Sequence, residues 1–383
     1  MKIQPSFRIR ELPPYLFFEL DLQKKKALEE GRNIIDLGVG DPDIECPSSL
    51  IEVIYRESKI KVNQKYPFDS GSGELKYSIK AWMKRRFGVN IEDENEILPL
   101  IGSKEGIVHF PMAILEEGDC VLVPNPCYPP YRSAVIFCGA RIIDMPLQEE
   151  NNFLPDLERI PKDILKRTKL MFLNYPNNPT SFCASEEFLR KVVEFAHQFG
   201  FIIIYDNAYS ELYCNKVPLS ILQVDGAKDV CIEFHSFSKT FCMTGFRLGW
   251  AVGNVEFITL LLRIKSNIDS GVFLAIQKGG SYLLNKEEGF IQRMRELYKK
   301  RREFFIEGLK SLGFEVRDGG ATFYVWTKVQ EKSIDFSKRL LIDFDIVATP
   351  GLGFGEYGEG YIRFSVTQPQ EVLEQALERL RKV

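Results

Sequence analysis

The stretch VCIEFHSFSKTFCMTGFRLGWAVG, residues 230–253, places a lysine and an arginine between two short apolar runs. The runs VCIEF (230–234) and GWAVG (249–253) have the length and composition of strands that are covered on both faces. Lysine is almost never fully buried without a partner or a chemical role, so Lys239 beside two such strands requires a reason. The stretch therefore predicts a buried sheet with an amine at its edge.

Similar apolar runs precede this stretch, and longer amphipathic segments separate them. They are CVLVP (120–124), ARIIDM (140–145), KLMFLNYP (169–176) and FIIIYD (201–206). Between two of the runs, apolar residues follow helical spacing behind Ser185, a suitable N-cap, and the pattern ends on Gly200. Strands that alternate with crossover helices predict an α/β fold with a mostly parallel sheet.

The pattern changes after residue 285. Apolar residues on helical spacing continue from 287 to 313, which is longer than most globular helices and suits a connector between domains. A strand, a Gly-Gly turn and a second strand are expected in 314–327, followed by a helix in 333–344, a strand in 361–366 and a terminal helix after Pro369. We expect an N-terminal arm that packs with the small domain (1–40), a large domain (41–285) and a small α+β domain (286–383).

Composition narrows the classes of function. The 383 residues carry a formal net charge of −3, so nucleic acid and anionic membranes are poor partners and small molecules are better ones. Eight scattered cysteines and three histidines argue against a zinc site or a disulfide scaffold. No segment has the pattern of a signal peptide or a membrane span. We expect a cytoplasmic protein without a bound metal.

A carboxylate and an amine are expected at neighbouring strand ends. Asp206 follows the run FIIIY, and Lys239 follows the next apolar run of the chain. In open α/β sheets the carboxyl ends of strands hold the ligand. This pair fits pyridoxal phosphate, because a lysine forms a Schiff base with its aldehyde and a carboxylate keeps its ring nitrogen protonated. Its phosphate would find donors at the helix start in 101–110, at Ser236 and at Arg247.

These residues carry a family resemblance. The segment SFSKTFCMTGFRLGW (236–250) resembles the lysine signature of fold-type I, class I/II aminotransferases, and this resemblance implies a large-domain sheet of seven mostly parallel strands. Similar segments extend over nearly the whole chain: DLGVGDPD (36–43), YPFDSGSGEL (66–75), PNPCYPPY (124–131), NYPNNPTS (174–181), YDNAY (205–209) and YIRFSV (361–366). Within the family, the chain is most similar to the LL-diaminopimelate aminotransferase branch and its aspartate-aminotransferase-like neighbours, which implies a role in lysine biosynthesis.

The resemblance implies a role for each matching cofactor residue. Lys239 would form the Schiff base, and Asp206 would be the partner of the pyridine nitrogen. Tyr209 and Asn178 would hydrogen-bond the phenolic oxygen of the cofactor, and Tyr128 would stack on its ring. The residues that would bind its phosphate are Ser103, Lys104, Ser236 and Arg247.

The resemblance also implies a homodimer and a substrate site. Tyr66 would reach the phosphate of the other subunit. Arg363 would bind the α-carboxylate of the substrate with both prongs of its guanidinium, helped by Asn178 and the backbone of Gly40. The substrates would be an amino acid, with LL-diaminopimelate or a dicarboxylic amino acid favoured, and a 2-oxo acid such as 2-oxoglutarate.

The chain departs from the family pattern at two positions. Ser181 stands where the family usually has glycine, and if that position needs a positive φ, serine implies a shifted turn. Asp69 replaces a longer glutamate that contacts the distal ammonium in the diaminopimelate branch. Tyr15 matches a substrate-contacting tyrosine of that branch, and anchoring of the N-terminal arm explains it equally well. The glycine-rich segment 351–360 precedes a strand and not a helix, so it is a loop before Arg363 and not a dinucleotide site.

Two other functions remain open on the same scaffold. A C–S β-lyase would use the same cofactor and lysine but would release pyruvate and ammonia without a 2-oxo acid. A non-catalytic pyridoxal-phosphate-binding regulator would need a DNA-binding segment or a damaged site, and the key side chains are present. Transamination is the leading hypothesis.

Overall fold

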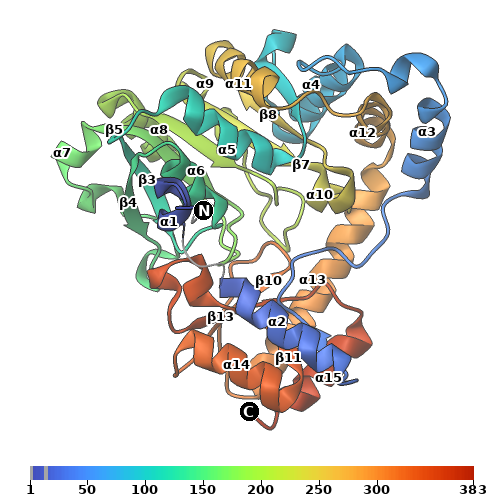
Figure 1. Cartoon of the computed structure of the whole chain (residues 1–383), viewed down its shortest axis with the longest axis vertical. Helices are drawn as coiled ribbons and strands as arrows, with labels where there is room; N and C mark the ends of the chain where they lie inside the picture. Colours follow the sequence, from blue (N-terminus) through green and yellow to red (C-terminus); the bar gives the residue numbers. More distant parts are fainter. Residues whose placement is uncertain (1–2, 13–15) are drawn as a thin grey trace.

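The computed structural model describes residues 3–12 and 16–383, with the backbone alone for 16–21. A seven-stranded sheet forms its upper half and a four-stranded sheet its lower half (Figure 1). The α/β class and the mostly parallel sheet predicted from the sequence are confirmed. Within the described residues, no helix has both the length and the apolar character that crossing a membrane requires.

The large sheet has the order β2-β8-β7-β6-β5-β3-β4. Its strands are β2 (Ile97–Leu100), β3 (Cys120–Asn125), β4 (Arg141–Pro146), β5 (Thr168–Asn174), β6 (Ile202–Asp206), β7 (Cys231–Ser236) and β8 (Gly249–Gly253). Only β8 runs against its two neighbours, because a short connection returns the chain from β7 into the sheet. The sequence pattern did not reveal β2, whose four residues include Pro99.

The helices of the upper half cover both faces of this sheet or flank it. They are α3 (Ser48–Ser58), α4 (Gly73–Phe87), α5 (Ser103–Ile114), α6 (Pro130–Phe137), α7 (Lys162–Leu165), α8 (Glu186–Phe199), α9 (Ala227–Val230), α10 (Phe237–Thr240), α11 (Val255–Ile268) and α12 (Leu274–Lys286). On β5, Leu170 and Phe172 pack with α5, α6 and α11, whereas Met171 and Leu173 pack with α8. The apolar run KLMFLNYP is therefore continuous because both of its faces are buried.

The predicted caps of the crossover helix are confirmed. The Ser185 side chain accepts a hydrogen bond from the backbone N–H of Phe188 at 3.1 Å, and Gly200 ends α8 with a φ of 76°. An N-cap hydroxyl satisfies a backbone donor that has no partner within the helix, and glycine takes the left-handed C-cap conformation without strain.

The lower half is built from both ends of the chain. The long helix α13 (Glu288–Ser311) runs from the upper half to the lower half and leads into the four-stranded sheet, of order β12-β13-β10-β9 (Figure 1). The remaining elements are α1 (Phe7–Glu11), α2 (Leu16–Glu29), β1 (Ile35–Asp36), β9 (Glu315–Arg317), β10 (Tyr324–Lys328), α14 (Ser333–Phe344), β11 (Ile346–Val347), β12 (Thr349–Pro350), β13 (Tyr361–Ser365) and α15 (Gln370–Leu380). The N-terminal β1 pairs with β11, whereas α1 lies against α6 of the upper half, where Nε of Arg8 donates a hydrogen bond to the carbonyl oxygen of Phe137 at 2.8 Å.

Candidate active site

The strand ends that carry the predicted residues meet at one edge of the large sheet. Asp206, at the end of β6, lies opposite Asn174 of β5 and Phe234 of β7. Ser236 of β7 and Leu100 of β2 both lie opposite Gly249, the first residue of β8. The segment after β2 and the lysine after β7 are therefore brought to the same edge, where an open α/β sheet holds its ligand.

Lys239 lies in the four-residue helix α10, directly after β7. Its Nζ donates a hydrogen bond to the carbonyl oxygen of Gly40 at 2.6 Å and lies 5.4 Å from the centre of the Phe323 ring. Burial lowers the pKa of Lys239, because the charged ammonium is poorly solvated there. A lowered pKa increases the fraction of neutral amine, which is the nucleophilic and proton-accepting form.

Asp206 is a buried carboxylate with two donors. It accepts a hydrogen bond from the Tyr131 hydroxyl at 2.7 Å and another from the backbone N–H of Ala208 at 3.1 Å. Burial raises the pKa of Asp206 to about 6, although both of these bonds lower it. A buried carboxylate of this kind is stabilised by a cationic partner. Tyr131 was not predicted as a site residue, and its only signal in the sequence is the second tyrosine of PNPCYPPY.

An anion cradle lies between the ends of β2 and β7. Gly102 precedes α5 with a φ of 75°, which favours glycine, and a Cβ there would lie 2.3 Å from Nη2 of Arg247, so a larger residue would push the guanidinium out of its place. Ser103 begins α5 and Lys104 follows it on the exposed side, while the Ser236 hydroxyl caps α10. Free N–H groups at a helix start, a guanidinium and a hydroxyl together suit a phosphate.

Ion pairs lie behind this cradle, on the buried side of α5. Lys265 is fully buried, and its Nζ contacts Glu105 at 2.9 Å and Asp269 at 2.6 Å. Glu105 also accepts the backbone N–H of Ile101 at 2.5 Å, which ties the segment before the cradle to α11. Glu105, His109 and Asp269 form a group of possible metal ligands, but the ammonium of Lys265 lies between the two carboxylates. The sequence pattern gave no signal for this network.

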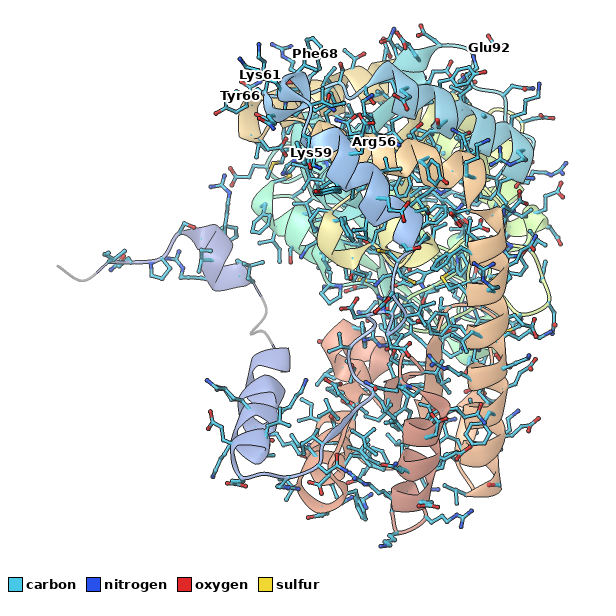
Figure 2. The ribbon with its side chains drawn as sticks, turned by 90° about the vertical axis from the view of Figure 1, so that its right-hand side faces the viewer. Arg56, Lys59, Lys61, Tyr66, Phe68 and Glu92 are labelled. Atoms are coloured by element: carbon cyan, nitrogen blue, oxygen red, sulfur yellow. The ribbon has the colours of Figure 1, made fainter. Side chains whose placement is uncertain are left out.

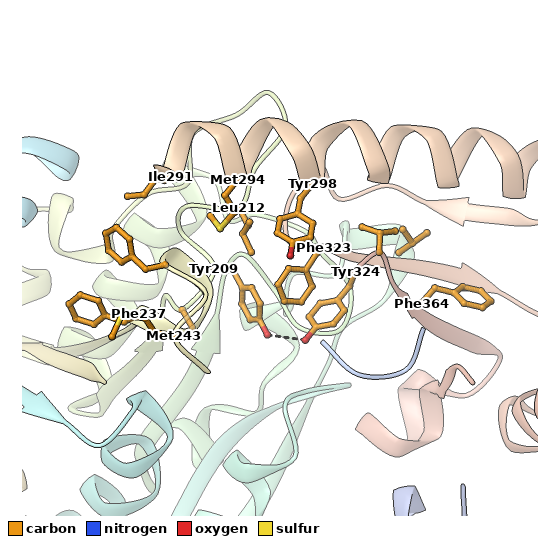
Figure 3. Close-up of a cluster of buried hydrophobic side chains, with 14 of the residues drawn as sticks. Tyr209, Leu212, Phe237, Met243, Ile291, Met294, Tyr298, Phe323, Tyr324 and Phe364 are labelled. Atoms are coloured by element: carbon orange, nitrogen blue, oxygen red, sulfur yellow. Dashed lines mark hydrogen bonds between the residues drawn. The ribbon is translucent and has the colours of Figure 1, made fainter. Parts of the chain in front are cut away.

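A continuous cluster of buried, mainly aromatic side chains from both halves of the molecule lies at this edge (Figure 3). The hydroxyl groups of Tyr209 and Tyr324 are 3.1 Å apart, and both rings pack on Phe323. Burial raises the pKa of Tyr209, and the neighbouring Tyr324 raises it further. Tyr324, in the second strand of FEVRDGGATFYVWT, was not predicted as a site residue.

Arg363 of β13 is buried and lies among polar groups. Its Nη1 donates to Oδ1 of Asn178 at 2.8 Å, and its Nη2 donates to the carbonyl oxygen of Gly38 at 2.7 Å. The Tyr324 ring lies 4.0 Å from the guanidinium carbon, and the Phe354 ring lies 4.7 Å from it. The buried Nε has no hydrogen-bond partner among the described residues. A buried cation with a free donor suits an anionic substrate group.

The segment that contains Gly40 is held firmly over Lys239. A Cβ on Gly40 would lie 2.0 Å from the Tyr324 hydroxyl, so a larger residue would displace that ring. Three residues later, Asp43 accepts two hydrogen bonds from Arg301 of α13, at 2.7 and 2.9 Å. The backbone of Gly40 is thereby fixed next to the amine.

Of the other predicted residues, Tyr128 lies near the site, whereas Tyr66 and Asp69 lie away from it. Tyr128 is half-buried, 5.7 Å from Tyr131 between ring centres, on the same side of the sheet as Asp206. Tyr66 is 93% exposed and touches none of the residues above, while Asp69 is half-buried in the same segment. Tyr15 lies outside the described residues.

Ser181 does not shift the turn, contrary to the expectation from its sequence. It keeps a positive φ of 70°, and its hydroxyl is hydrogen-bonded to Thr322 and to the backbone of Tyr324. The side-chain bonds offset the strain that a residue with a Cβ meets in this conformation. The loop 351–360 forms two short 3₁₀ turns, and the side chain of Asn125 accepts the backbone N–H of Tyr357 at 3.1 Å.

Comparisons with known proteins agree with this geometry. The family model described as aminotransferase class I and II matches residues 32–380. The chain is 48% identical to the LL-diaminopimelate aminotransferase of Aquifex aeolicus, over 99% of this chain and 98% of that protein. Among solved structures, substrate-bound BacF from Bacillus subtilis is 37% identical with a TM-score of 0.96, covering 100% of this chain and 98% of that one. Aspartate aminotransferase from Thermotoga maritima is 28% identical with a TM-score of 0.93, covering 99% of both chains.

The described residues fit pyridoxal 5′-phosphate, the cofactor of this family. The cradle at Gly102 and Arg247 suits its phosphate, the carboxylate of Asp206 suits a protonated ring nitrogen, and the amine of Lys239 suits its aldehyde. The orphaned Nε of Arg363 leaves a donor for the substrate. With the matching family model and full-length relatives, this fit shows that the chain belongs to the class I and II aminotransferases, fold-type I enzymes that depend on pyridoxal 5′-phosphate.

Proposed function

We propose that this aminotransferase takes its amino group from LL-diaminopimelate and passes it to a 2-oxo acid, 2-oxoglutarate. The main support is the similarity over nearly full length to several curated proteins named LL-diaminopimelate aminotransferase, at 44 to 48% identity. Such an enzyme would act in lysine biosynthesis in the cytoplasm. The same relatives favour transamination over C–S β-elimination.

The proposed chemistry divides between two side chains. The bound cofactor supplies an aldehyde that attaches substrate amines and a ring that withdraws electrons from the substrate Cα. Lys239 would hold the cofactor through its amine when no substrate is present. Once a substrate amine has displaced it, the free Nζ would take the proton from the substrate Cα and give it to the carbon that carried the aldehyde. Asp206 holds a proton on the ring nitrogen, because a cation beside it relieves the cost of its own buried charge.

The other residues of the site would bind and orient the substrate and the cofactor. Arg363 binds the α-carboxylate of both substrates, supported by its orphaned Nε and by its position beside Asn178. Tyr209 and Asn178 hold the phenolic oxygen of the cofactor, and Tyr128 covers its ring. The phosphate is held by Ser103, Lys104, Ser236 and Arg247.

We place the distal end of the substrate at the dimer interface. Tyr66 is 93% exposed and Phe68 is 84% exposed, and both project from one corner of the molecule (Figure 2). Large exposed apolar side chains that lie close together are typical of a surface that another chain covers. A second copy of this chain would let Tyr66 reach the partner's phosphate and let Asp69 contact a distal ammonium, with Tyr15 as a further contact.

The domain limits belong to the same proposal. Residues 41–285 would form the cofactor-binding domain, and residues 286–383 with the arm 1–40 would form the small domain. Support comes from the large sheet, which lies between residues 97 and 253, and from the pairing of β1 with β11.

A half-reaction screen tests the amino donor. The purified enzyme with cofactor is mixed with single amino acids, and loss of the absorbance band of the lysine-bound cofactor is followed without any 2-oxo acid. Fast bleaching by LL-diaminopimelate and slow bleaching by aspartate, glutamate and meso-diaminopimelate are expected. Bleaching by aspartate at the same rate would refute LL-diaminopimelate as the specific donor. Release of pyruvate and ammonia from a sulfur amino acid added without any 2-oxo acid would favour the lyase.

Mixed dimers test the shared site. Tyr66→Ala and Lys239→Ala are each expected to be nearly inactive alone. If Tyr66 serves the partner's site, a dimer with one copy of each variant has one complete site, and random mixing should restore about a quarter of wild-type activity. No recovery, with subunit exchange verified by mass, would refute the role of Tyr66 across the interface.

A further inference from the structure

Two buried residues that contact each other beside the site, Ser181 and Thr322, hold the left-handed backbone conformation. Ser181 has a φ of 70° and Thr322 has a φ of 58°. Both are almost completely buried. For a β-branched residue such as threonine this conformation is a true outlier, and such outliers persist only where surrounding contacts hold them. The two residues come from segments 141 positions apart in the sequence.

Their hydroxyl groups form a closed ring of hydrogen bonds with the backbone of Tyr324. The hydroxyls of Ser181 and Thr322 are 2.7 Å apart, Ser181 Oγ donates to the carbonyl oxygen of Tyr324 at 2.9 Å, and the N–H of Tyr324 donates to Thr322 Oγ1 at 3.0 Å. Because Ser181 donates to Tyr324, the Thr322 hydroxyl must donate to Ser181. Each hydroxyl then donates once and accepts once, so one arrangement satisfies all three bonds.

The ring connects the two groups that surround Arg363. On one side, the backbone N–H of Ser181 donates to the carbonyl of Asn177 at 2.9 Å and closes the turn that presents Asn178 to the guanidinium. On the other side, Tyr324 places its ring 4.0 Å from the guanidinium carbon and its hydroxyl 3.1 Å from that of Tyr209. A change in the distance between the Asn178 turn and Tyr324 would therefore move the contacts that both residues make with Arg363.

We propose that Ser181 and Thr322 are positioning residues for the substrate carboxylate, acting through the spacing between Asn178 and Tyr324. The serine that replaces the family glycine is therefore functional here, because a glycine would keep the turn but lose the hydroxyl. This inference rests on the proposed role of Arg363 as the carboxylate-binding residue. It predicts an effect on both substrates, since the amino acid and the 2-oxo acid each carry that carboxylate.

Removal of one hydroxyl tests the proposal in the enzyme with its cofactor. Thr322→Val keeps the shape but not the hydroxyl, and Ser181→Gly removes the hydroxyl while tolerating a φ of 70°. Each is expected to raise KM for both substrates about tenfold, with a smaller change in kcat. Thr322→Ser retains the hydroxyl and should restore KM towards the wild-type value. The variant that combines Ser181→Gly with Thr322→Val should have a KM no higher than that of the more affected single variant, because either substitution alone already breaks the ring of hydrogen bonds.

Ser78→Ala is the matched control. Ser78 and Ser281 form another buried hydroxyl pair, 2.7 Å apart, between α4 and α12. Loss of the Ser78 hydroxyl should lower the midpoint of thermal unfolding and leave KM for both substrates unchanged. If Ser181→Gly and Thr322→Val lower the midpoint but leave both KM values unchanged, while Arg363→Lys raises them, the ring is only structural and the inference is wrong. If Arg363→Lys also leaves KM unchanged, the carboxylate site in the proposed function has failed.

Discussion

Replacing Asp206 by asparagine should stabilise the cofactor-free protein at neutral pH while removing activity. Asp206 is 4% exposed, and burial raises its pKa from the ordinary 3.8 to about 6. A difference of about two pH units corresponds to about 3 kcal/mol of folding free energy. Below pH 3.8 the carboxyl is protonated in both states and carries no such cost. The cost grows between about pH 4 and 6, because the unfolded chain releases its proton first, and it is complete above about pH 6.

The assay is denaturant unfolding of the cofactor-free proteins at several pH values from about 4 to 8. The amide of the variant carries no charge at any of these pH values, so the wild type should lose about 3 kcal/mol more than Asp206→Asn as the pH rises from about 4 to 7. The comparison uses the change of unfolding free energy with pH in each protein. Any effect of the asparagine on Tyr131 that does not depend on pH therefore cancels. With pyridoxal phosphate the wild type should regain stability, and the variant should gain less.

Parallel stability curves for the two proteins would refute this reasoning, because they would mean that Asp206 is not a costly buried charge. Activity gives an independent check. With cofactor present, Asp206→Asn is expected to lower kcat/KM by about a hundredfold or more, since a buried cation would lose its partner.

Three further outcomes are expected. Lys239→Ala should abolish turnover and prevent any borohydride-reducible attachment of the cofactor to the protein, and activity at the wild-type rate would contradict the mechanism. Arg363→Lys should raise KM for both substrates by about 30-fold or more, because an ammonium cannot reproduce the two-pronged contact, and an effect on one substrate alone would argue against a shared carboxylate site. Lys265→Met should weaken cofactor binding, measured by fluorescence titration, because Glu105 and Asp269 would be left as unpaired buried charges behind the cradle; unchanged affinity would show that this network does not shape it.

Much of the fold could be predicted from local sequence pattern. The runs ending at Asp206 and Ser236 are strands because continuous branched and aromatic residues suit a sheet buried on both faces. Strand β2 was missed, because four residues that include a proline carry too little signal. The antiparallel direction of β8 also had no local signal. The direction of a strand depends on which edge of the sheet is still unpaired when the chain folds back to it, and a short stretch of sequence does not contain that information.

The sequence by itself determined the chemical groups and the strand ends that bear them. Lys239 follows one apolar run and Asp206 ends another. Because the carboxyl ends of parallel strands meet at one edge of a sheet, the sequence was enough to predict that these two side chains lie close together. Tertiary structure alone decided the partners: Tyr131 on Asp206, Asn178 on Arg363, and Lys265 behind the cradle. Periodicity reports which face of an element is buried, but not which distant side chain meets it there. Those contacts join residues 75, 185 and 160 positions apart, and only the packing of whole elements sets such distances.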